Sequence, residues 1–138
     1  MTLVVDASVA VKWVCDEADS DAAAALLARD DLAAPALWLV EANSALWRRA
    51  RIGELTEDEA EERARELALA PVASIPCQRD LPSALRLALD LRHSIYDCLY
   101  LALAIREDCA MVTADRKFRQ LALAQSHIAT RIVALGYA

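Results

Sequence analysis

Two aspartates follow apolar segments, at positions where an acid could bind a metal ion. Asp6 comes directly after Leu3–Val5, and Asp115 comes directly after Met111–Ala114. Short apolar segments of this kind are typical of buried strands. We therefore expect both aspartates at the carboxyl ends of strands, where open α/β sheets bind their ligands. Because each aspartate also precedes a helical pattern, the alternative role for both is an ordinary helix N-cap.

Two further acids lie in helical segments that are otherwise mainly apolar. Residues three and four positions from Glu41 are mostly apolar, so its carboxylate is expected on an apolar helix face. Asp97 is the only acid in the strongly apolar segment Ser94–Ile105. Ionised carboxylates are rarely buried unless they are paired or bind a metal. The alternatives are a partly exposed helix edge for Glu41 and a capping box with Ser94 for Asp97.

Four carboxylates brought close together repel one another unless they are protonated or neutralised by a cation. Oxygen ligands without a cluster of histidines or cysteines favour Mg²⁺, with Mn²⁺ as a substitute. Ser8, Asn43 and Thr113 lie close in sequence to three of the acids and are candidates to orient ligands or water. Their alternative roles are local turn, helix-surface and strand-end hydrogen bonds. His93 and His127 have no histidine or cysteine partner at ligand spacing, so we assign them no catalytic role.

The elements that must position these residues alternate along the chain. Strands are predicted at 3–5, 30–35, 72–75, 110–113 and 131–135, and helices at 8–14, 19–29, 36–52, 56–70, 80–92, 94–107 and 117–124. Thr56-x-x-Glu59 is a capping box for the fourth of these helices. Alternating short strands and helices predict an α/β fold, with a short central parallel sheet flanked by helices in three layers. The 138 residues are expected to form one domain.

Composition excludes several classes of protein. The two glycines are too few for a phosphate-binding loop or a dinucleotide fingerprint. The longest apolar run, Cys98–Ile105, is too short to span a membrane. With no secretory signal and no Cys-x-x-Cys pair, the protein is expected in the cytoplasm and away from membranes. A net charge of −6 argues against a general nucleic-acid binder, but not against an enzyme whose acids are neutralised by cations.

Four short motifs, in order along the whole chain, resemble those of PIN-domain ribonucleases, and specifically of VapC-like toxins. These motifs are Val4–Ser8, Leu39–Leu46, Tyr96–Ala104 and Thr113–Phe118. The resemblance implies a PIN-like fold and an endoribonuclease that hydrolyses RNA phosphodiester bonds with Mg²⁺ and leaves a 5′-phosphate. It further implies an acidic metal site made of Asp6, Glu41, Asp97 and Asp115. Ser8 and Thr113 would occupy polar positions beside this site.

The resemblance also implies partners: an RNA substrate, a cognate antitoxin protein and a second copy of the chain in a homodimer. Lys12, Arg116 and Lys117 lie near the acids in sequence and are candidates to contact RNA phosphates. Some family members carry another acid shortly after the fourth acid of the site, whereas here Arg116 and Lys117 follow Asp115. The number of metal ions bound, one or two, is therefore left open. For the basic cluster 48–51, we favour an interaction with the helix dipole.

Two other functions remain open on the sequence alone. One is a PIN nuclease with a housekeeping role in RNA processing, which a neighbouring antitoxin reading frame would argue against. The other is a non-catalytic α/β binding module in which the acids are only helix caps. Failure to bind a divalent metal would favour this binding module.

Overall fold

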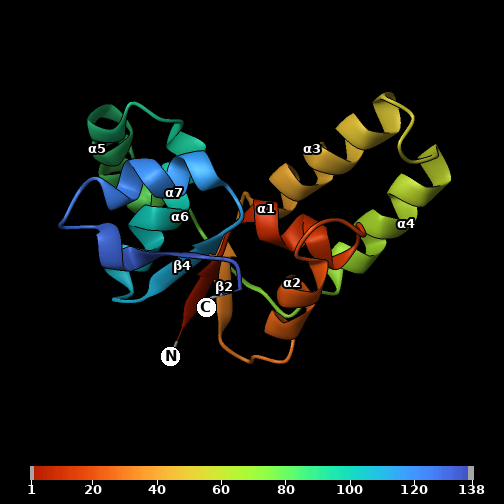
Figure 1. The fold of residues 1–138 in the computed structure, drawn as a ribbon, viewed down its shortest axis with the longest axis horizontal. Coiled ribbons are helices and arrows are strands. Elements are labelled where there is room, and N and C mark those ends of the chain that lie inside the picture. The colour runs from red at the N-terminus through yellow and green to blue at the C-terminus, as the bar shows by residue number, and fades with distance from the viewer. Residues whose placement is uncertain (1, 137–138) are drawn as a thin grey trace.

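Five short parallel strands form the centre of the molecule. The structure, a computed structural model, describes residues 2–136. One sheet contains the strands in the order β3-β2-β1-β4-β5, and all its neighbouring pairs are parallel (Figure 1). The strands are β1 (Leu3–Val5), β2 (Leu32–Pro35), β3 (Ala73–Ile75), β4 (Ala110–Thr113) and β5 (Ile132–Ala134). Their position and order confirm the predicted α/β fold.

Helices connect the strands and cover the sheet. They are α1 (Ala7–Ala10), α2 (Ser20–Leu26), α3 (Trp38–Arg51), α4 (Glu57–Ala68), α5 (Leu81–Leu91), α6 (Ile95–Arg106) and α7 (Arg116–Leu123). Single 3₁₀ turns lie at Val11–Trp13, Gln78–Asp80 and Ala129–Arg131. In Figure 1, α3 and α4 form a pair that extends to the right of the sheet, while α5, α6 and α7 lie to its left in this view. No helix of residues 2–136 is long and apolar enough to cross a membrane.

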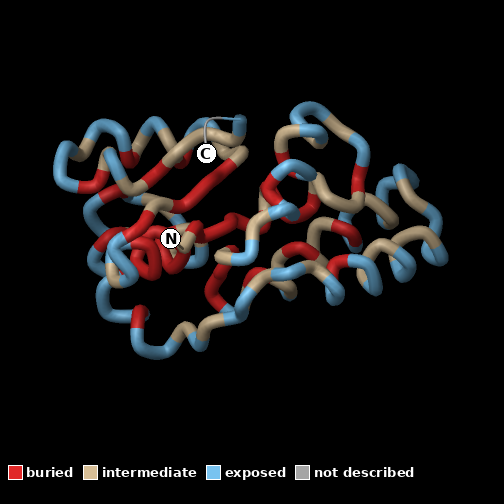
Figure 2. The backbone as a smooth tube through the Cα atoms, turned by 90° about the horizontal axis from the view of Figure 1, so that it is seen from below, coloured by how far each residue is buried: buried red, intermediate tan, exposed pale blue. Residues whose placement is uncertain are grey.

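The core has two parts because successive residues of a strand point to opposite faces of the sheet. On β1, Val4 packs in the larger cluster with α3, α5, α6 and α7, whereas Leu3 and Val5 pack in the smaller cluster with α2. The buried segments lie in the middle of the molecule, and the outer turns of the helices are exposed (Figure 2). The middle of helix α6 is continuously buried, from Cys98 to Ala104. Asp97 therefore lies in the first turn of α6, immediately before this buried segment.

A buried ion pair fixes the far end of α6. The guanidinium of Arg106 donates two hydrogen bonds to Asp80, at 2.6 Å from Nε and 3.0 Å from Nη2. Asp80 is only 5% exposed and immediately precedes α5. The pair joins the end of α6 to the start of α5, and these two helices pack closely along their length. It therefore helps to hold the helix that carries Asp97.

Most predicted elements begin and end within a few residues of those observed. The capping box at Thr56 and Glu59 is present, and Gly53 ends α3 with a φ of 84°. The helix predicted at 8–14 is wrong in its second half, because α1 ends at Ala10 and a 3₁₀ turn follows. β-branched valines crowd the preceding helical turn, which disfavours a long helix here.

Candidate active site

The candidate acids converge at the point where the strand order reverses direction. From β1 the chain winds outwards through β2 to β3, then crosses to β4 on the other side of β1. Strands β1 and β4 are direct neighbours, with Val5 opposite Val112. Asp6 and Asp115 therefore leave the same edge of the sheet side by side. Such a switch point is where parallel α/β sheets bind ligands.

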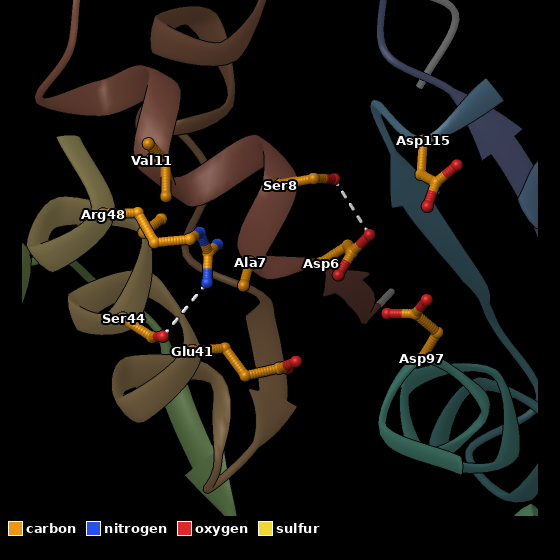
Figure 3. A pocket seen from close by; sticks show the side chains of 10 residues that line it. Asp6, Ala7, Ser8, Val11, Glu41, Ser44, Arg48, Asp97 and Asp115 are labelled. Carbon is orange, nitrogen blue, oxygen red and sulfur yellow. Dashed lines mark hydrogen bonds between the residues drawn. The ribbon is translucent and has the colours of Figure 1, made fainter. Parts of the chain in front are cut away.

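A pocket of about 230 Å³ lies at this edge, and all four acids line it (Figure 3). Asp6, Asp97 and Asp115 point towards one another from β1, α6 and the end of β4, while Glu41 points into the pocket from α3. Four elements that are distant in sequence thus each supply one carboxylate. The alternatives in which these acids act only as local caps do not explain this convergence.

Asp6 is buried and is held by two hydroxyl groups. Its side chain is not a helix cap, although it stands at the N-cap position of α1. Ser8 Oγ donates to Asp6 Oδ2 at 2.9 Å, and Thr113 Oγ1 donates to the same oxygen at 2.7 Å. The pKa of Asp6 is raised to about 6, mainly by burial and also by the charges of Asp97 and Glu41, against the opposing effect of the two hydroxyl hydrogen bonds. A cation in the pocket would favour the ionised carboxylate.

Asp97 and Asp115 are connected through two aromatic rings. His93 Nε2 donates to Asp97 Oδ2 at 2.6 Å, so the carboxylate is engaged by this ring rather than by the predicted capping box. The His93 ring stacks on Phe118, with ring centroids 4.8 Å apart. The backbone N–H of Phe118 donates to Asp115 Oδ1 at 3.0 Å, so Asp115 is both a helix cap and a pocket residue. Ligand atoms of His93, Asp97 and Asp115 lie within 4.8 Å of one another.

Glu41 is half-buried and does not extend into solvent. The hydroxyl of Tyr100, which is fully buried, donates to Glu41 Oε1 at 2.6 Å. Burial raises the pKa of Glu41, the hydrogen bond from Tyr100 lowers it, and the charge of Asp97 raises it. Arg48, one of the basic cluster, lines the same pocket and donates to Ser44 at 3.1 Å. The sequence pattern missed the parts played by Tyr100 and Arg48.

The polar residues proposed beside the acids divide into two groups. Ser8 and Thr113 lie at the site, where they bond Asp6 as described. Asn43 does not: its amide donates to the Leu39 carbonyl at 2.8 Å, and it faces the groove between α3 and α4. The physical reason is helix geometry, because residues two positions apart, such as Glu41 and Asn43, point in widely different directions. The structure therefore does not bring Asn43 to the acidic pocket.

The basic residues proposed as phosphate contacts also differ in position. Lys12 is engaged away from the pocket, donating to Glu17 at 3.2 Å and to the Ala18 carbonyl at 2.7 Å. Arg116 and Lys117 are exposed at the start of α7, next to Asp115. The sequence assigns no role to His93, which lies just before the N-cap of α6, yet its ring reaches the Asp97 carboxylate in the first turn of that helix.

The fold and the pocket together define an α/β protein with an acidic site at the switch point of its sheet. A model of the PIN domain family matches residues 3–124, and the chain therefore belongs to this family. PIN domains are generally metal-dependent nucleases. The crystal structure of PAE2754 from Pyrobaculum aerophilum is similar, with 26% sequence identity and a TM-score of 0.71 over 98% of this chain and 91% of that one. No curated protein sequence matches the chain.

Proposed function

We propose that the protein is a Mg²⁺-dependent endoribonuclease and the toxin of a toxin–antitoxin pair. The observation that carries the nuclease proposal is the convergence of Asp6, Asp97 and Asp115 from three separate elements on one pocket, with Glu41 on its far wall. Membership of the PIN domain family supports the same chemistry. Mn²⁺ is expected to substitute for Mg²⁺ because both prefer oxygen ligands.

The residues of the pocket fit a divalent cation. Both hydroxyl donors bond Asp6 Oδ2, and neither bonds Oδ1, so this second oxygen is available to a metal. The raised pKa of Asp6 means that the ionised carboxylate is disfavoured in the protein alone. Asp6 and Asp97 are our first choices as direct ligands, with Asp115 completing the acidic ring. Mg²⁺ bound there would supply charge neutralisation at the phosphate and a water of lowered pKa.

The chain's own residues would then position the reactants. Ser8 and Thr113 fix the orientation of Asp6, and His93 fixes that of Asp97. Glu41 lies across the pocket from the three aspartates and is proposed to orient the attacking water or to act as a further ligand. Tyr100 holds Glu41 in this position. Hydrolysis by in-line attack would leave a 5′-phosphate on the product.

Two apolar surfaces support the proposed protein partners. A groove between α3 and α4 is lined in part by Leu46, Trp47 and Ala60, and such a groove suits an apolar antitoxin segment. On α5, Leu81, Leu85 and Leu89 are all exposed at a spacing of four residues. A stripe of this kind suits a helix-to-helix contact with a second copy of the chain. The proposed antitoxin and homodimer rest on these surfaces and on the resemblance to toxins.

The proposed function is tested by RNA cleavage. A pool of random-sequence single-stranded RNA is incubated with the protein in Mg²⁺, Mn²⁺ or EDTA. We expect cleavage with either metal, none in EDTA, and products that carry a phosphatase-sensitive 5′-phosphate. Asp97→Asn should cleave at least about 100-fold more slowly, because a metal ligand is lost. Asp90→Asn, which neutralises an exposed carboxylate on α5, is the control and should keep full activity.

Two results would contradict the proposal. The first is equal cleavage by the Asp97→Asn variant and the wild-type protein, which would point to a contaminating nuclease. The second is a wild-type protein that cleaves no RNA in either metal, which would leave the non-catalytic binding module as the better explanation.

A further inference from the structure

A second pocket lies directly beside the acidic one, on the other side of Asp115. Its volume is about 370 Å³, and α7 and the ends of β4 and β5 form its walls. Asp115 lines both pockets. A linear polymer that places one phosphate among the acids can therefore place a neighbouring group in this second pocket. The residues that line it are Asp19, Thr113, Ala114, Asp115, Arg116, Arg119, Gln120, Ala134 and Leu135.

Two arginines without a carboxylate partner project from α7 into this pocket. Arg116 and Arg119 are three residues apart and therefore share a helix face. Within residues 2–136 neither forms an ion pair or a side-chain hydrogen bond. By contrast, several other arginines each bond a carboxylate, namely Arg29, Arg49, Arg86, Arg106 and Arg131. Unlike other arginines without an ion pair among the described residues, such as Arg65 and Arg79, both line a pocket that shares Asp115 with the acidic site.

Arg119 adds an observation that points to a missing ligand. Its Nε atom is buried and has no hydrogen-bond partner among the described residues. A buried donor without a partner is costly, and more so when it belongs to a charged group. The only other such atom in residues 2–136 is Arg63 Nε, on α4, and Arg63 lines neither this pocket nor the acidic one. An anion in the second pocket would satisfy Arg119.

We propose that this second pocket binds a backbone phosphate of single-stranded RNA next to the phosphate that is cleaved. The proposal rests on the proposed nuclease function and adds the residues that hold the substrate strand. The planar guanidinium of arginine matches the oxygens of a phosphate in a bidentate arrangement. Gln120 lies one turn from Arg116 and offers an amide donor to the same group.

This assignment changes which basic residues are expected to bind RNA. Lys117 lines neither pocket, because it lies on a different face of α7 from Arg116 and Arg119. Lys12 bonds Glu17. Asp19 is the one carboxylate of the second pocket that is not part of the acidic site, and its charge opposes a phosphate. Replacing Asp19 should therefore strengthen RNA binding, whereas replacing the arginines should weaken it.

The test measures RNA binding in EDTA, where no cleavage occurs. Fluorescence anisotropy is recorded with a short fluorescein-labelled single-stranded RNA at several salt concentrations. We expect the double variant Arg116→Gln/Arg119→Gln to bind about tenfold more weakly or worse, a loss of at least about 1.4 kcal/mol. The slope of log K against log salt should fall by about 0.7 for each phosphate that the variant no longer neutralises. Asp19→Asn should bind more tightly, and Asn tolerates the left-handed φ of 66° at this position.

The control is the double variant Arg65→Gln/Arg79→Gln, which removes two exposed arginines from elsewhere with the same change in charge. Thermal melting of each variant establishes that it is folded. If the Arg116→Gln/Arg119→Gln protein binds RNA as tightly as this control, the second pocket does not hold the strand. Inorganic phosphate and unlabelled RNA are also compared as competitors of the labelled RNA. If phosphate displaces the labelled RNA at the same concentration as unlabelled RNA does, the pocket binds a free anion and the assignment to an RNA strand is wrong.

Cleavage measured in parallel separates this inference from the function on which it rests. A wild-type protein that cleaves RNA with Mg²⁺, together with an arginine double variant of unchanged affinity, overturns only the second pocket. A wild-type protein that neither binds nor cleaves RNA overturns both proposals.

Discussion

Replacing Asp6 by asparagine is expected to stabilise the metal-free protein at pH 7 while abolishing RNA cleavage. Asp6 is 4% exposed, and its ionised form is disfavoured by burial and by the charges of Asp97 and Glu41. Asparagine has the same shape, and its amide oxygen can accept both hydroxyl hydrogen bonds now made to Asp6 Oδ2. A pKa increase from 3.8 to about 6 corresponds to roughly 3 kcal/mol at pH 7. The variant therefore loses a metal ligand but gains stability.

The pH dependence of this gain follows from the direction of the pKa change. Because the pKa of Asp6 is higher in the folded state, the unfolded state releases this proton first as the pH rises. The wild-type protein without metal should therefore lose stability between about pH 4 and pH 6, and the full loss should remain above pH 6. The difference in unfolding free energy between Asp6→Asn and wild type should grow over the same interval.

Chemical denaturation in EDTA at several pH values checks this prediction. Asp90→Asn, with an exposed carboxylate on α5, is the matched control and should differ little from wild type at every pH. A less stable Asp6→Asn protein at pH 7 would mean that Asp6 contributes to the fold through its ionised form. In that case the carboxylate would be a structural group rather than one poised for a cation.

The largest loss of stability is expected from Asp80→Ala. This change leaves the guanidinium of Arg106 without the carboxylate that accepts two of its hydrogen bonds. Removing one partner of a buried ion pair costs about 3–5 kcal/mol, and the lower end applies because the Arg106 side chain is 25% exposed and keeps its ion pair with Glu107. A loss of about 3 kcal/mol lowers Tm by roughly 10 °C for a chain of this size. Thermal melting measures this change directly.

Asp90→Ala is the control for the ion-pair prediction. It breaks the pair of Arg86 and Asp90, which lie four residues apart on α5 with side chains 67% and 46% exposed. Exposed pairs of this kind contribute about 0.3–0.5 kcal/mol, so Tm should hardly change. Equal Tm values for the two alanine variants would show that the Asp80 pair does not anchor α6.

The individual acids could be predicted from sequence because each stands in a local pattern that it interrupts. Asp6 and Asp115 follow apolar strands, and Glu41 and Asp97 lie in apolar helices. Their convergence could not be predicted from these patterns alone, because it depends on β1 and β4 being neighbours. Strand order is set by contacts between residues more than a hundred positions apart, such as Thr113 with Asp6. The resemblance to PIN-domain proteins supplied this long-range information.

The supporting residues show where sequence proximity misleads. Asn43 lies two residues from Glu41 yet points away from the pocket. Tyr100 lies 59 residues from Glu41 and donates the hydrogen bond that holds it. His93 has no histidine or cysteine partner at ligand spacing in the sequence, yet its ring bonds the carboxylate of Asp97. Contacts around a site depend on helix faces and on packing between elements, so the neighbours of an acid in the chain identify few of its neighbours in space.

The central claim is that the four acids form a divalent-metal site, and thermal melting with Mn²⁺ tests it without any knowledge of the RNA target. Wild type and Asp97→Asn are melted in EDTA and then in excess Mn²⁺. We expect Asp97→Asn to be at least as stable as wild type in EDTA, because repulsion among the acids is relieved. At about 100-fold excess over Kd, Mn²⁺ should stabilise wild type by about 2.7 kcal/mol, a rise of several degrees in Tm, and Asp97→Asn by much less. Equal Tm values with and without Mn²⁺ for the wild-type protein, together with an Asp97→Asn protein that is only destabilised, would contradict the metal site.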